Sequence, residues 1–453
     1  MSAFADRIRG IVAPGRQSLP DPQDPRDLRD PRDLPDPRDP QDPRDDLSVP
    51  PDLSAALSGE WRDGCFVVDR RWDPDARHGR ERIGELASRL DQASAEAPLF
   101  TGGTGAAQAR PPFVFFDLET TGLSGGAGTL AFLVGCAWFE TDGSFVSRQF
   151  LLAKHADEGP LLETVAGELA HAGALVSFNG KSFDAPLLES RFLYHRLPWT
   201  AGAVPHIDVL HPARRFWKMR DRRTQSPASQ SEGRENSCSL QALERQLLGV
   251  RRVGDVPGFE IPARYFQFVR SGDARPLEGI LEHNRLDLLT LAALTARLLH
   301  MTRSGPDAVT DPQEALALGH VFARSGFEDR ATAAYRRALE RCRSPRGAYD
   351  PIRIDALRAL ALTCRRTRRH DEAASCWSEL MATRGCPAPI AREATEALAI
   401  HHEHRRRDLA AAKAFALLSL QSGMGGAWTE SARHRLSRIE RKMGQGESLK
   451  LEV

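Results

Sequence analysis

The sequence lacks the features of a membrane or secreted protein. Nowhere do about 18 apolar residues run together, so no transmembrane helix is predicted. The opening stretch MSAFADRIRGIVAPG carries charges where a signal peptide needs an apolar core. The seven cysteines are scattered and form no C-x-x-C pair, which disfavours a zinc ribbon or a disulfide framework. We therefore expect a cytoplasmic protein with reduced thiols.

The chain also has almost no net charge. Its 62 Lys and Arg residues nearly balance 61 Asp and Glu residues, for a formal net charge of +1. Any surface for nucleic acid must therefore be a local basic patch. The 453 residues, 41% of them hydrophobic, are enough for two or three domains with sizeable cores.

The N-terminal segment, residues 1–52, is predicted to be a disordered tail. Residues 18–50 repeat Asp, Pro and Arg (SLPDPQDPRDLRDPRDLPDPRDPQDPRDDLSVP), and so few apolar groups cannot offset the entropy lost on ordering. Residues 53–110 are interpreted as an N-terminal extension and linker with one short strand pattern, CFVVD. The sequence leaves open whether this extension belongs to the domain that follows.

Residues 111–304 have the pattern of an α/β domain in which helices flank a mixed sheet. Three closely spaced strand patterns predict an antiparallel meander, and helical patterns then alternate with one further strand pattern, 174–178. The meander strands are expected at 113–118, 130–139 and 144–152, and the helices at 158–171, 185–196, 238–249 and 276–300. A polar, flexible stretch is predicted at 219–237.

Residues 311–453 show no strand pattern and contain three segments that align with one another. The segments are 314–340, 355–381 and 393–419. Each predicts two helices joined by a short polar turn, with an alanine four residues before an aromatic side chain: Ala331/Tyr335, Ala373/Trp377 and Ala411/Phe415. The pattern resembles tetratricopeptide repeats. A plain helical bundle is the alternative.

Two acids stand together in the stretch FFDLETTGLSGGAG. Asp117 and Glu119 follow an apolar strand and point to the same face, because strand side chains alternate with a period of two. Paired carboxylates suit Mg²⁺ or Mn²⁺, although a strand that ends at a solvated edge gives the same pattern. The glycines lack a P-loop or dinucleotide fingerprint, and another strand follows them, so no nucleotide cofactor is expected. A turn beside a scissile strand and a simple tight hairpin both remain open.

Two further motifs carry acids. Asp184, in SFNGKSFDAPLL, is a candidate metal ligand, a candidate N-cap of the helix that follows it, or both. His283 and Asp287, in EHNRLD, are four residues apart and therefore share one face of an apolar helix. An unpaired acid there would be costly to bury, so a metal or a basic partner is expected nearby.

The motifs FDLETTG, SFNGKSFDAPLL and EHNRLD resemble the three motifs of the DEDD superfamily of 3′-5′ exonucleases, which has the ribonuclease-H-like fold. The chain resembles more closely still the bacterial YprB-type ribonuclease-H-like proteins, a branch in which helical-repeat tails are common. That resemblance is carried by LETTGLSGGAGTLAFLVG, VSFNGKSFDAPLLESRF, HIDVLHPARRFW, GDVPGFEIPARYF and LEHNRLDLLTLA, which span 113–295. It implies a metal-dependent 3′-5′ exonuclease that hydrolyses single-stranded nucleic acid.

The resemblance also implies roles for the acids. Two divalent ions, Mg²⁺ or Mn²⁺, would be bound, one by Asp117, Glu119 and Asp287 and the other by Asp117 with Asp184. His283 would orient or deprotonate the attacking water. The spacing departs from the superfamily, because three residues separate His283 from the last acid where the histidine subgroup has four.

Residues around these motifs are candidates for contacts with nucleic acid, because arginines bind phosphates and aromatic rings stack on bases. They are Asn179, Lys181, Asp208, Arg214, Arg215, Arg264 and Tyr265. The repeats are expected to bind a protein partner. The alternative is a non-catalytic nucleic-acid-binding or scaffold protein, and the sequence does not decide between DNA and RNA.

Overall fold

The computed structural model describes residues 53–101, 108–122, 128–218, 238–421 and 427–451. The predicted disordered tail, the middle of the glycine-rich turn and the polar stretch at 219–237 lie outside the described residues. No described helix is long and apolar enough to cross a membrane. All seven cysteines are free, as predicted.

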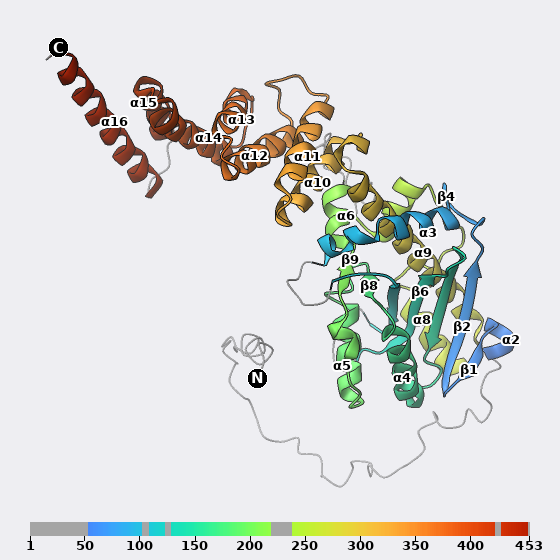
Figure 1. Ribbon diagram of the computed structural model, residues 1–453. Coiled ribbons are helices and arrows are strands. Elements are labelled where there is room, and N and C mark those ends of the chain that lie inside the picture. The colour runs from blue at the N-terminus through green and yellow to red at the C-terminus, as the bar shows by residue number, and fades with distance from the viewer. Residues whose placement is uncertain (1–52, 102–107, 123–127, 219–237, 422–426, 452–453) are drawn as a thin grey trace, which may run out of the picture. The chain divides into compact units, whose positions relative to one another are not determined.

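A seven-stranded mixed sheet forms the centre of the α/β part, as predicted (Figure 1). Its order is β1-β2-β7-β6-β5-β8-β9. The central strand β5 pairs antiparallel with β6 and parallel with β8, which in turn pairs parallel with β9. The strands are β1 (Glu60–Arg62), β2 (Cys65–Trp72), β5 (Phe113–Thr120), β6 (Ala131–Phe139), β7 (Phe145–Leu151), β8 (Ala174–Ser177) and β9 (His206–Asp208). The predicted meander is therefore confirmed as β5-β6-β7, whereas the three-residue strand β9 was not predicted.

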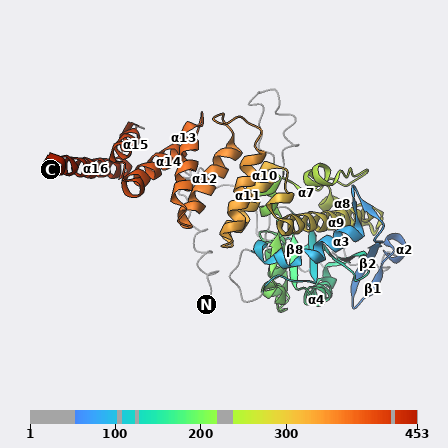
Figure 2. The ribbon, with the colours of Figure 1, turned by 45° about the horizontal axis from the view of Figure 1, so that its top comes forward.

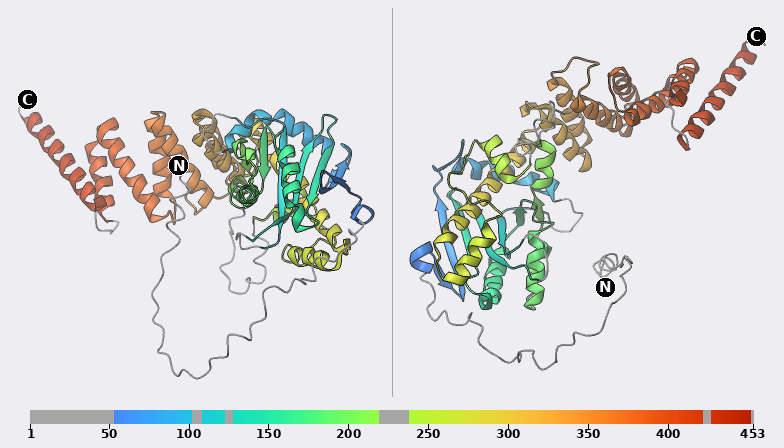
Figure 3. Two further views of the ribbon diagram at one scale, coloured as in Figure 1. Left: turned by 90° about the horizontal axis from the view of Figure 1, so that it is seen from below. Right: turned by 180° about the vertical axis from the view of Figure 1, so that it is seen from behind.

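Strand β5 is buried because both of its faces meet a hydrophobic core. Phe113 and Phe115 contribute to one core, and Val114 and Phe116 contribute to the other. Helices cover both faces of the sheet (Figure 3). They are α3 (Ile83–Gln92), α4 (Glu158–Leu169), α5 (Asp184–Tyr194), α6 (Leu210–Phe216), α7 (Leu240–Leu243), α8 (Ile261–Ser271) and α9 (Arg275–Ser304).

Residues 53–100 belong to this domain, a point that the sequence left open. Strand β2 pairs with β7 from Phe66↔Leu151 to Trp72↔Phe145 and so extends the sheet. Helix α3 is amphipathic and buries Ile83, Leu86 and Leu90 against the core that contains α9. The segment also contains α2 (Leu53–Leu57) and the hairpin β3 (Arg77–His78) and β4 (Glu81–Arg82). Sequence patterns missed this membership because β2 and its partner β7 are far apart in the chain.

The C-terminal part consists of antiparallel helical hairpins, each packed on the next (Figure 2). The helices are α10 (Pro312–Arg324), α11 (Glu328–Arg341), α12 (Pro351–Arg366), α13 (His370–Ala382), α14 (Ala388–His401), α15 (Leu409–Gln421) and α16 (Ala427–Leu451). Asp311 and Asp350 cap α10 and α12 by accepting backbone N–H groups. Gly319 of α10 lies against Tyr335 of α11, where a Cβ would approach the ring to 2.4 Å. Ala331 and Tyr335, the first small-and-aromatic pair predicted from the sequence, are both buried in this packing.

Candidate functional site

The first two acids lie at the end of the central strand. Asp117 and Glu119 alternate with Leu118 along β5, so their carboxylates share one face, and both are half-buried. The pairing of β5 with β6 becomes irregular directly after Glu119. Strand β5 thus places two carboxylates at the point where its pairing with β6 loses its regular register.

The third acid follows the neighbouring parallel strand. Asp184 is the first residue of α5, and the N-cap position is occupied by Phe183 without a side-chain cap hydrogen bond. The alternative that Asp184 serves as the N-cap is therefore wrong. Gly180 lies close by, where a Cβ would come within 2.9 Å of Asp184 Oδ2. The glycine leaves room for the carboxylate beside the end of β8.

The fourth acid and the histidine lie on α9. His283 is 7% exposed, and its Nε2 lies 3.5 Å from Oδ2 of Asp287, one turn later. Between them, Asn284 Nδ2 donates to Asp117 Oδ2 at 2.9 Å. This bond ties α9 directly to β5, so the first and third motifs meet in the fold.

The charges of the four acids act on one another. Burial raises the pKa of Asp117 well above its usual value, and the charges of Asp287, Glu119 and Asp184 raise it further. Burial likewise raises the pKa of Glu119, and the charges of Asp287 and Asp184 raise it further. The pKa of Asp184 rises to about 7 through burial and then through the charge of Asp208. A cation bound among these carboxylates would relieve the desolvation and the repulsion.

Arg252 supplies one such cation. Its guanidinium donates to Asp287 Oδ1 at 2.5 Å and to Glu244 Oε2 at 2.8 Å, and it lies 3.4 Å from Asp255 Oδ2. Asp255 Oδ1 in turn accepts from Nδ1 of His283 at 2.7 Å. The sequence prediction assigned no role to either residue, although Asp255 stands inside GDVPGFEIPARYF, which carries the family resemblance, and Arg252 stands two residues before it. The basic partner expected for Asp287 is this arginine.

The donor set fits a divalent metal only in part. Hard cations prefer carboxylate oxygens, and within the described chain no Lys, Arg or His forms an ion pair with Asp117, Glu119 or Asp184. However, the described residues contain no group of three His, Cys, Asp or Glu side chains already converged as metal ligands. Asp117, Glu119 and Asp184 thus remain available to a metal, whereas Asp287 is shared with Arg252.

Two residues that were predicted to contact nucleic acid, Tyr265 and Asp208, are buried and make contacts within the fold. Tyr265 is fully buried, stacks on Phe132 at 4.0 Å and donates its hydroxyl to Leu152 O, so the prediction that it stacks on a base is wrong. Asp208 is 2% exposed and accepts the backbone N–H groups of Asn179 and Lys181. Asp208 therefore shapes the loop that precedes Asp184.

The other predicted contacts are divided between the loop after β8 and more distant helices. Lys181 donates from Nζ to Thr101 O at 2.8 Å. Arg214 and Arg215 are exposed in the last turn of α6. Arg264 pairs with Glu260 at 3.0 Å on α8. These basic side chains thus come from three different elements, the loop after β8, α6 and α8.

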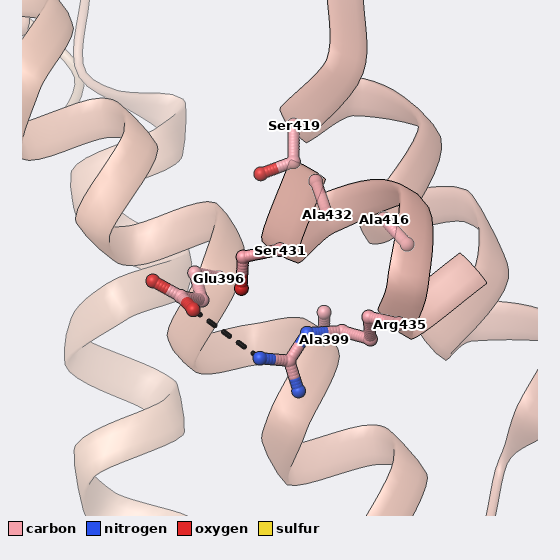
Figure 4. A pocket seen from close by; sticks show the side chains of 7 residues that line it. All are labelled: Glu396, Ala399, Ala416, Ser419, Ser431, Ala432 and Arg435. Carbon is pink, nitrogen blue, oxygen red and sulfur yellow. Dashed lines mark hydrogen bonds and ion pairs between the residues drawn. The ribbon is translucent and has the colours of Figure 1, made fainter. Parts of the chain in front are cut away.

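Three hollows of the described surface are lined by residues other than the four acids. A small one, of about 10 Å³, lies among α14, α15 and α16 and contains the Arg435–Glu396 ion pair (Figure 4). Two larger hollows of about 600 and 620 Å³ border α6 and the first repeats. None contains the carboxylates, so the candidate site rests on the chemistry of its acids and on their coupling.

Comparisons with known proteins agree with this geometry. Residues 114–299 match the sequence model of the RNase_H superfamily, and residues 312–379 match that of the tetratricopeptide repeat. The chain is 32% identical over 385 residues to the uncharacterized protein YprB of Bacillus subtilis, covering 83% of this chain and 86% of that protein. The similarity therefore includes both the α/β part and the helical repeats.

Proposed function

We propose that this chain, which belongs to the ribonuclease-H-like superfamily and to the family of YprB within it, is a divalent-metal-dependent nuclease. The observation that carries the proposal is the cluster of Asp117, Glu119 and Asp184. Burial disfavours the charged forms of all three, the other acids of the cluster add to this for Asp117 and Glu119, and Asp208 adds to it for Asp184. No described cation pairs with these three acids. A site that holds such acids without internal compensation is suited to a cation from solution.

Each of the four acids has a place in the proposed reaction. Asp117, Glu119 and Oδ2 of Asp287 would hold one Mg²⁺ or Mn²⁺, and Asp117 with Asp184 would hold the second. When bound, the ions would stabilise charge on the attacking and leaving oxygens of a phosphodiester and lower the pKa of bound water. Asn284 keeps Asp117 oriented by donating to one of its oxygens.

His283 is the proposed acceptor of the water proton. Its Nδ1 is engaged by Asp255, which fixes the ring and leaves Nε2 on the side of Asp287. An imidazole can accept a proton near neutral pH. The 3′-5′ polarity and the single-stranded substrate follow from the family resemblance, and a protein partner for the repeats follows from the repeat family.

A non-catalytic nucleic-acid-binding or scaffold protein is the second candidate. One observation favours it: Arg252 already occupies an oxygen of Asp287. An internal cation at that position lowers the need for a metal there.

Cleavage of end-labelled single-stranded DNA and RNA in Mn²⁺ separates the two candidates. We expect the wild-type chain to produce a ladder from the 3′ end and Asp117→Asn to produce none. Asp91→Asn changes an exposed acid on α3 and serves as the control. Equal cleavage by wild type and Asp117→Asn would contradict the proposal, and binding without cleavage would favour the scaffold.

A further inference from the structure

We infer that Arg252 and Asp255 are positioning residues, Arg252 for the metal ligand Asp287 and Asp255 for the base His283. This inference rests on the proposed nuclease function. Both residues come from the loop that connects the π-helical turn Glu244–Leu248 to α8. The loop thus contacts both functional side chains of α9, Asp287 through Arg252 and His283 through Asp255.

Arg252 hydrogen-bonds to one carboxylate oxygen of Asp287 and not to the other. The guanidinium donates to Oδ1 of Asp287 at 2.5 Å, while Oδ2 faces Nε2 of His283 at 3.5 Å. The Arg252 side chain is only 6% exposed. A charged group this deeply buried needs partners, and its planar fork satisfies Glu244, Asp255 and Asp287 together. Carboxylates that bind metals are commonly oriented by such outer hydrogen bonds.

Asp255 performs the corresponding task for His283. Its Oδ1 accepts from Nδ1 of the imidazole at 2.7 Å, and its Oδ2 faces Arg252 at 3.4 Å. In a neutral ring, donation from Nδ1 to a carboxylate places the lone pair on Nε2, which can then accept a proton. Asp255 therefore selects the form of His283 that the reaction requires.

The loop is fixed at both ends, so it can hold these contacts in register. At its start, Gly249 adopts φ +73°, and Leu248 O accepts the N–H of Arg80 at 2.9 Å. At its end, Val256 is buried against Gly279 of α9, where a Cβ would meet Val256 Cγ2 at 2.8 Å. Glu244, the other partner of Arg252, also accepts from Thr290 of α9 at 2.9 Å.

Two measurements separate the roles of the pair. Arg252→Gln should weaken Mn²⁺ binding in calorimetry by about 10–100-fold, because Asp287 loses its orientation and its counter-charge. Arg252→Lys keeps the charge but not the fork and should recover part of the affinity. Asp255→Ala should leave Mn²⁺ affinity within about twofold yet lower kcat by at least about tenfold at unchanged KM. Asp255→Asn, which keeps an acceptor, should restore part of kcat.

Arg275→Gln is the matched control, because Arg275 makes an exposed ion pair with Asp273 at the start of α9 and should change neither Mn²⁺ affinity nor kcat. Circular dichroism and the unfolding midpoint show whether each variant is folded. Arg252→Gln with wild-type or tighter Mn²⁺ binding would overturn its role, the latter outcome marking Arg252 as a competitor of the metal. If Asp255→Ala lost Mn²⁺ affinity to the same extent as Arg252→Gln, Asp255 would have a structural role and not a positioning role for His283. A wild-type chain that neither binds Mn²⁺ nor cleaves overturns the proposed function itself.

Discussion

Asn284 of α9 donates from Nδ2 to Oδ2 of Asp117 over 2.9 Å, and this bond joins the last motif of the sequence to the first. Gln149 Nε2 donates to Asn284 Oδ1 at 2.9 Å, which fixes the amide in turn. Asn284 is fully buried. The position of Asp117 therefore depends on a chain of hydrogen bonds through β7 and α9.

Asn284→Ala should break that chain. Gln149 and Asp117 would each lose a buried partner, so we expect the free energy of unfolding to fall by about 1–3 kcal/mol. Mn²⁺ affinity should fall as well, because Asp117 is no longer held. Urea denaturation and calorimetric titration measure the two effects. Unchanged values in both would show that the amide is dispensable.

Gly135→Ala tests how closely α9 approaches the sheet. Gly135 pairs with Asp117 in the β5–β6 ladder, and a Cβ there would lie 2.1 Å from Asn284 Oδ1. Backbone or helix must shift, so we expect a loss of about 1–3 kcal/mol in denaturation. Gly167→Ala is the control, because a Cβ at Gly167 of α4 meets nothing within 4 Å. A similar outcome for the two variants would argue against close packing at Gly135.

The double variant Asp117→Asn, Glu119→Gln should lose activity and gain stability in the absence of metal. Removing two buried carboxylates that repel their neighbours should raise the metal-free free energy of unfolding by roughly 0.5–2 kcal/mol. Mn²⁺ should no longer stabilise the variant, whereas it should raise the melting temperature of the wild-type chain. Thermal melts with EDTA and with Mn²⁺ provide both readings. A less stable metal-free variant would contradict the repulsion inferred here.

His78 should make stability depend on pH. Burial lowers the pKa of His78 to about 4, with a further contribution from Arg252, and its Nε2 lies 2.9 Å from Thr290 Oγ1. Because the pKa in the folded state is below the unfolded value near 6.5, the unfolded chain binds the proton more tightly. The contribution of His78 is therefore complete above about pH 6.5 and is lost as the pH falls toward 4.

Urea denaturation of wild type and His78→Gln between pH 4 and 8 measures this effect. We expect the wild-type curve to fall more steeply below pH 6.5, by up to roughly 3 kcal/mol. Parallel curves would show that His78 does not titrate differently in the two states.

Gly319→Ala tests the packing of the first repeat. A Cβ at Gly319 would lie 2.4 Å from the ring of Tyr335, so we expect a loss of about 1–3 kcal/mol. Tyr335→Leu removes the ring edge, and the double variant should therefore lose less than the sum of the two single variants. Strict additivity in thermal melts would mean that the two side chains do not compete for the same space.

The sequence by itself determined the meander, the faces on which the acids lie and the helical repeats. Apolar runs of strand length predicted the meander, and the period of two placed Asp117 and Glu119 on one face of β5. The helix period placed His283 and Asp287 together on α9, and small residues beside aromatic ones predicted the repeats. All of these depend on neighbours within a few residues, which local periodicity encodes.

Only the tertiary structure decided which distant residues complete the site. It joined β2 to β7 and so brought residues 53–100 into the domain. It also buried Tyr265, which its residue type and its position near the motifs had made a candidate for base stacking. It also brought Arg252 to Asp287 and Asp255 to His283, across 35 and 28 residues. An arginine in a polar loop gives no local signal of its partner, because the partner is set by how the loop packs on α9.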